Sequence, residues 1–213
     1  MPDKAGLKKF REIENMLKRF FSLFEDLCAH CFTESMGAIS SGVRPHKDMC
    51  CCLVDNQAHD HWQSLAKAQE MTNGPNWAKA IEQNGFTTGK RRMPNNGPCK
   101  ALCNRGCLLS CMRPPSCSTL VCSHMVRVLV DLKLCQNPKH GGNCEIDELL
   151  GVQSPLDAMY GIKSGNASSD QYVNALRALI ERMKAIPEGQ RRAAISQSKT
   201  QMSQSIHNGG GRR

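Results

Sequence analysis

The stretch 6-GLKKFREIENMLKRFFSLFEDLCAHCFT-33 decides the fold class. Its apolar residues recur every three or four positions with Lys and Glu between them, which is the pattern of an amphipathic helix. These positions are Leu7, Phe10, Leu17, Phe20, Phe21, Phe24, Leu27, Cys28 and Cys31. Because Cys28 and Cys31 continue the stripe one helical turn apart, we expect both thiols to point toward the core. They are either small core residues or the first two ligands of a metal site.

Similar patterns elsewhere predict a mainly α protein, a small helical domain around a loop-rich centre. Helices are expected over residues 60–71, 76–85 and 118–134, and two more within 145–186, while 34–49 and 86–98 are expected to be loops. From Pro187 the composition shifts to Gln, Ser, Arg and Gly, which is typical of disorder. The sequence therefore predicts a helical domain at 1–186, with its core motif at 28–122, and a basic disordered tail at 187–213.

Composition and charge narrow the class of protein. The chain has 213 residues, a formal net charge of +9 and thirteen cysteines, an odd number that cannot pair completely. The charged N-terminus lacks the apolar segment of a signal peptide, and no run of 18 apolar residues predicts a membrane span. We therefore expect a cytoplasmic protein with reduced thiols and no membrane contact. The positive charge favours a nucleic-acid partner, although metal-bound thiolates would offset part of it.

A second stretch, 97-GPCKALCNRGCLLSCMRPPSCSTLVC-122, holds six cysteines within 24 residues. Its Gly and Pro residues allow the backbone to turn sharply, so several thiolates can converge on one ion. No pair of CxxC motifs with zinc-finger spacing is present. The block therefore predicts metal binding and leaves the metal open between zinc and iron.

The order of cysteines in this block, with Arg113-Pro114 before Cys117, resembles the second half of the CxxCxxCC zinc- or iron-chelating family (YkgJ-like). Cys28 with Cys31 and the pair Cys51-Cys52 resemble its first half. The resemblance implies a zinc or iron site, or an iron–sulfur cluster, held by eight cysteines. They are Cys28, Cys31, Cys51, Cys52, Cys99, Cys107, Cys117 and Cys122. The other five have no counterpart in the family and are expected to be ordinary thiols: Cys50, Cys103, Cys111, Cys135 and Cys144.

Other polar residues near the cysteines have two interpretations each. His59 and His61 flank Asp60, and His124 lies two residues after Cys122, so each histidine either supports a metal site or lies on a helix surface. Arg113 and Asp55 either adjust the charge around thiolates or form surface pairs.

Two alternatives to simple chelation stay open. One branch of the family resembles flagellin lysine methylases that use an iron–sulfur cluster, which implies a protein-modifying enzyme. The basic linker and tail instead favour a nucleic-acid-binding protein with structural zinc. The common nucleotide-binding and hydrolase motifs do not occur in the sequence.

Overall fold

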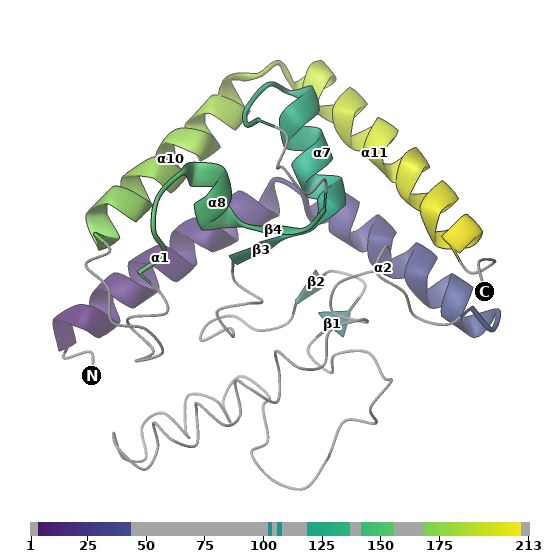
Figure 1. Cartoon of the computed structure of the whole chain (residues 1–213), viewed down its shortest axis with the longest axis horizontal. Helices are drawn as coiled ribbons and strands as arrows, with labels where there is room; N and C mark the ends of the chain where they lie inside the picture. Colours follow the sequence, from purple (N-terminus) through teal and green to yellow (C-terminus); the bar gives the residue numbers. More distant parts are fainter. Residues whose placement is uncertain are drawn as a thin grey trace, which may run out of the picture. The chain divides into compact units, whose positions relative to one another are not determined.

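The computed structural model describes residues 4–43, 102–103, 106–107, 119–136, 142–155 and 168–209. These ranges contain six helices and two pairs of two-residue strands, which confirms a mainly helical protein (Figure 1). The helices expected over 60–71 and 76–85 lie outside the described residues. In the described ranges, no helix is long and apolar enough to cross a membrane.

The chain divides into two compact units. The first contains residues 1–27 and 118–201, and the second contains residues 28–117 and 202–213. Helices α2 (Glu25–Ser40) and α11 (Glu188–Gly209) each contribute residues to both units. This division does not coincide with the boundary expected between residues 186 and 187.

The core of the first unit forms between α1 (Lys4–Ser22) and α10 (Ser169–Ala185), which lie against each other (Figure 1). Both helices bury an apolar stripe with helical spacing, as expected for 6–33 and 145–186. The buried apolar side chains are Ile13, Met16, Leu17 and Phe20 on α1, and Tyr172, Val173, Leu176, Leu179, Ile180 and Met183 on α10. At one end Lys9 forms an ion pair with Asp170 at 2.5 Å. Ser168 caps α10 by accepting a hydrogen bond from the Gln171 amide at 3.2 Å.

A short strand pair and two helices complete this core. Strand β3 (Leu120–Val121) pairs antiparallel with β4 (Cys144–Glu145), and α8 (Ile146–Leu150) follows β4 directly and contacts α10. Helix α7 (Ser123–Asp131) buries Val128 and Leu129 completely. The helix expected over 118–134 is therefore shorter than predicted, because its first residues pair with β4 instead.

The single helix expected over 6–33 is two helices, α1 and α2. They are separated at Leu23 and Phe24, where the amides of these residues bond to the carbonyls of Phe20 and Phe21 at 3.1 and 3.0 Å. Phe24 is fully buried, with its ring centroid 5.3 Å from that of Phe20. The apolar repeat continues through the turn, so periodicity could not show the break.

The loop expected over 34–49 is also shorter than predicted, because α2 continues to Ser40. The helix ends where Gly42 adopts a left-handed φ of +87° and the Val43 amide bonds back to the Ala38 carbonyl at 3.0 Å. This is the usual glycine stop of a helix. The small residues before it were compatible with helix, and only Gly42 marks its end.

The expectation of disorder from Pro187 is wrong for most of that segment, because α11 is a helix of 22 residues. One residue per turn is buried: Ala194, Ser198, Met202 and Ile206. In the first unit, the Ser198 hydroxyl donates to the His124 carbonyl at 3.1 Å, and Arg127 donates to the Gln201 side-chain oxygen at 2.7 Å. These tertiary contacts stabilise a helix whose composition is mostly polar.

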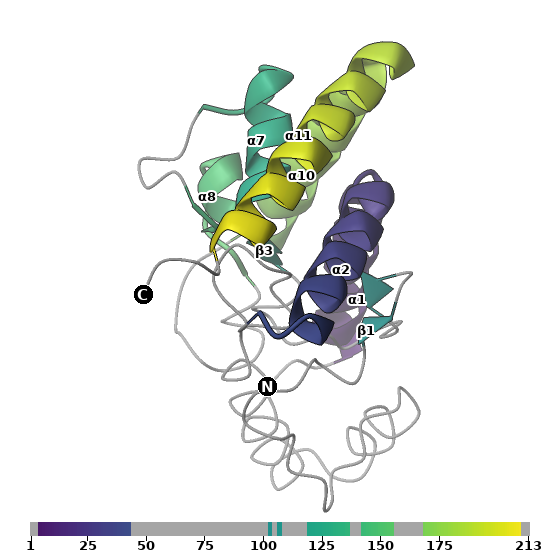
Figure 2. The same ribbon diagram turned by 90° about the vertical axis from the view of Figure 1, so that its right-hand side faces the viewer.

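In the second unit, the turns of α2 after Leu27 are linked to the last turns of α11 (Figure 2). His30 Nε2 lies 2.9 Å from the Ser203 hydroxyl, and His207 Nε2 lies 3.1 Å from a carboxylate oxygen of Glu34. Both contacts advance by four residues on each helix, so the two segments run in the same direction. Strands β1 (Leu102–Cys103) and β2 (Gly106–Cys107) belong to the same unit and pair antiparallel.

Candidate functional site

The CxxC motif lies on α2. Cys31 is buried, with 7 % of its surface exposed, and Cys28 is half-buried. The two residues are three positions apart on a regular helix, so they follow one another on adjacent turns. His30, between them in sequence, is directed to the Ser203 hydroxyl of α11. The prediction that Cys31 faces the core is confirmed, and Cys28 lies at the edge of the buried face.

Two further cysteines lie in the strand pair β1–β2. Cys107 is opposite Leu102, and Cys103 is opposite Gly106. The backbone pairing therefore brings Cys103 and Cys107 to neighbouring positions on adjacent strands. The resemblance selected Cys107 and left Cys103 without a role, whereas the backbone places both in one hairpin.

Cys122 belongs to the first unit, at the junction of β3 and α7. It is the N-cap residue of α7, with φ −69° and ψ 157°, and its side chain does not cap the helix. The next residue, Ser123, donates its amide hydrogen to the side-chain oxygen of Asn143 at 2.8 Å. This bond and the β3–β4 pairing fix Cys122 beside the segment that leads into Cys144.

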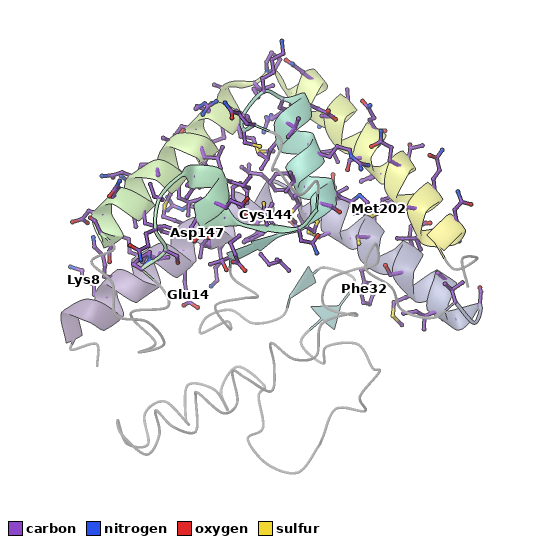
Figure 3. All side chains as sticks on the ribbon, viewed as in Figure 1. Lys8, Glu14, Phe32, Cys144, Asp147 and Met202 are labelled. Atoms are coloured by element: carbon purple, nitrogen blue, oxygen red, sulfur yellow. The ribbon has the colours of Figure 1, made fainter. Side chains whose placement is uncertain are left out.

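Cys135 and Cys144, which were expected to be ordinary thiols, lie within electrostatic range of each other. Burial is the largest of the causes that raise the pKa of Cys144 to about 12, followed by the charges of Glu148, Cys135, Glu145 and Cys122. Burial also raises the pKa of Cys135, while the nearby Arg182 guanidinium lowers it. Both residues therefore carry protonated thiols at neutral pH when no metal is bound. Cys144 is labelled in Figure 3 beside β4.

His124 is not a helix-surface residue, which was one of the two interpretations of the sequence. It is buried in α7, with 6 % of its surface exposed. Its backbone carbonyl accepts the hydrogen bond from Ser198. The apolar residues that follow it in α7 draw this turn of the helix into the core.

The remaining candidates lie outside the described residues. They are the ligand candidates Cys51, Cys52, Cys99 and Cys117, the thiols Cys50 and Cys111, and His59, Asp60, His61, Asp55 and Arg113. Across the ranges that the structure does describe, no three His, Cys, Asp or Glu side chains form a group that could hold a metal ion. None of the five cysteines with described side chains is in a disulfide. Of the predicted ligand set, the structure thus places the Cys28–Cys31 pair, the Cys107 backbone and Cys122.

No protein-family model, curated protein or solved structure matches this chain. The resemblance in the order of cysteines therefore rests on the residues between Cys28 and Cys122 themselves.

Proposed function

We propose that the protein chelates zinc or iron through cysteine thiolates and that Cys28 and Cys31 supply the first two ligands. The observation that carries the proposal is their position on consecutive turns of α2, with Cys31 buried and Cys28 at the edge of the buried face. Side chains three positions apart on a helix have Cβ atoms about 5–6 Å apart. Two thiolates at that spacing can bind one ion, since zinc–sulfur bonds are about 2.3 Å long.

The other ligands come from the cysteines that follow along the chain. The resemblance assigns these roles to Cys51, Cys52, Cys99, Cys107 and Cys117. Cys122, the N-cap residue of α7, completes the eight that the resemblance implies. Because α2 supplies only two thiolates, a four-coordinate site requires at least two from these later segments.

Metal binding also supplies stability that the amino-acid composition lacks. The sequence contains ten aromatic residues: six Phe, two Trp and two Tyr. Structural zinc contributes about 10–16 kcal/mol of apparent binding free energy in small peptides. That is enough to offset the backbone entropy of several ordered residues at roughly 1–2 kcal/mol each.

The test compares the metal content of variants purified without oxygen. Cys31→Ser and Cys117→Ser are expected to lower the amount of zinc or iron per chain, because each removes one thiolate ligand. Cys135→Ser is the matched control, since this cysteine has no counterpart among the proposed ligands, and it should retain the wild-type metal content. Equal metal content in all three variants would refute the assignment of ligands.

The same preparation distinguishes chelation from iron–sulfur chemistry. A brown protein with visible charge-transfer absorption and acid-labile sulfide favours the cluster-dependent enzyme, such as a lysine methylase. A colourless zinc protein excludes that alternative and leaves a chelating or structural site.

A further inference from the structure

We propose that metal binding at Cys28 and Cys31 and the docking of the last turns of α11 on α2 stabilise each other. The inference rests on the proposed metal site and adds a regulatory element to it, because residues near the C-terminus then control how tightly the ion is held. The residues concerned lie within 28–40 and 202–209, and both ranges belong to the second unit.

Two polar contacts join α2 to these turns of α11, and the first starts within the CxxC motif. His30 Nε2 lies 2.9 Å from the Ser203 hydroxyl. One turn later on both helices, His207 Nε2 lies 3.1 Å from a carboxylate oxygen of Glu34. The apolar residues next to these two positions on α11 are fully buried: Met202 and Ile206. The end of α11 is thus attached to the part of α2 that carries the thiols.

The contacts to α11 and the Cys28 thiol lie on different edges of α2. The buried face of the helix consists of residues three or four positions apart: Leu27, Cys31, Ser35 and Ala38. Successive residues of an α-helix are about 100° apart around the axis, so Cys28 lies at one edge of this face and His30 with Glu34 at the other. Docking of α11 at the His30 edge therefore does not compete with an ion that binds at the Cys28 edge.

Both events restrict the same turn of α2. An ion held by Cys28 and Cys31 fixes the helical conformation between them, because both thiolates must point to one ion. The contact between His30 and Ser203 requires the same turn, since His30 lies between the two cysteines in sequence. An event that orders a segment lowers the entropy cost of a second event that needs the same order, and this coupling is equal in both directions. Metal binding should therefore strengthen the docking of α11, and docking should strengthen metal binding.

The first experiment measures amide hydrogen exchange in the full-length protein, which is freed of metal by a chelator and then loaded with Zn²⁺. Zn²⁺ serves as the probe because thiolate ligands favour it. On zinc loading, exchange is expected to slow in residues 202–209 as well as in residues 28–36. Residues 176–183 of α10, in the first unit, should exchange at an unchanged rate, which distinguishes the coupling from a general stabilisation. Cys31→Ser lacks one of the two thiolates and should show no zinc-dependent change in 202–209.

The reciprocal experiment measures the zinc affinity of two matched double variants in competition with a chromogenic chelator. The variant with Ser203→Ala and His207→Ala loses both polar contacts to α2. The control, with Gln204→Ala and Asn208→Ala, changes two exposed residues at the same spacing on α11. The net contribution of one hydrogen bond corresponds to about a two- to tenfold change in an equilibrium constant. We therefore expect the first variant to bind zinc about two- to tenfold more weakly than the wild type, and the control to match the wild type.

The two experiments separate the coupling from the metal site on which it rests. A wild-type chain that binds no zinc would contradict the proposed metal site and the coupling with it. A wild-type chain that binds zinc through Cys31, but shows the same exchange in 202–209 with and without zinc or the same zinc affinity in both double variants, would overturn the coupling and leave the metal site intact.

Discussion

Lys133 has a left-handed backbone conformation that a residue with a Cβ atom adopts at a cost. Its φ is 56°, and it occupies the position after α7 where a glycine is usually found. Its side chain is exposed, so little packing is lost when it is removed. Lys133→Gly is expected to raise the free energy of unfolding by about 1 kcal/mol. Chemical denaturation measures the change.

Lys133→Ala serves as the control for this prediction. Alanine retains the Cβ atom that makes the left-handed conformation unfavourable, and it removes the same charge. It should therefore give no comparable gain. A similar stability for both variants would show that the backbone conformation at Lys133 carries no strain.

The buried thiol of Cys144 makes the free energy of unfolding depend on pH in the alkaline range. The pKa of its thiol rises from an ordinary value of 9.0 to about 12 in the folded protein, chiefly through burial. Between these values the unfolded chain loses the proton and the folded chain keeps it, so stability decreases as pH rises from 9 to 12. Cys144→Ala should flatten this part of the stability curve, by at most about 1.4 kcal/mol per pH unit. An unchanged alkaline slope in denaturation experiments would contradict the buried, neutral thiol.

Single positions differ in how far the sequence alone predicts their environment. Cys31 could be predicted to be buried because it continues the apolar stripe through Leu27. The burial of His124 could not be predicted, since a histidine two residues after a cysteine was expected on a helix surface or near a metal, and its burial depends on the packing of α7. The placement of Cys144 opposite Val121 depends on a two-residue strand pair that is too short for any sequence periodicity.

Among the secondary-structure elements, the largest differences between prediction and structure are at the ends of helices. The apolar repeat of 6–33 predicted helix correctly on both sides of Leu23, but the turn there depends on burying Phe24 against Phe20. Gly42 ends α2 in the way that its residue type favours. For α11, the four-residue spacing of buried positions was a signal of helix, although Ala194 and Ser198 contribute little hydropathy to it.

Helix α11 provides a direct test of the corrected C-terminal segment. Met202 is fully buried, so Met202→Ala is expected to lower the free energy of unfolding by about 2–5 kcal/mol. Gln204, two residues later, is exposed, and Gln204→Ala should change stability by less than about 0.5 kcal/mol. Denaturant unfolding of the two variants compares them. If residues 187–213 were disordered, neither substitution would change the free energy of unfolding, and that result would contradict the helix.

For the molecule as a whole, the helical class could be predicted because several long segments carry an apolar stripe of helical period. The division into two units could not, since α2 and α11 each contribute to both and no change in composition marks the crossing. The candidate site is also only partly predictable from the sequence. Clustered cysteines predict metal chemistry, whereas the choice of cysteines that could bind one ion depends on how segments distant in sequence fold.

The measurement that tests the central claim most directly is the metal content of the wild-type chain, combined with a count of reactive thiols. Protein purified without oxygen is analysed for zinc and iron, and its thiols are titrated before and after a chelator removes the metal. Metal-bound thiolates react slowly, so we expect at least one metal ion per chain and about four or more additional reactive thiols after chelation. A cooperatively folded protein that contains neither metal and gives the same thiol count in both titrations would contradict the account.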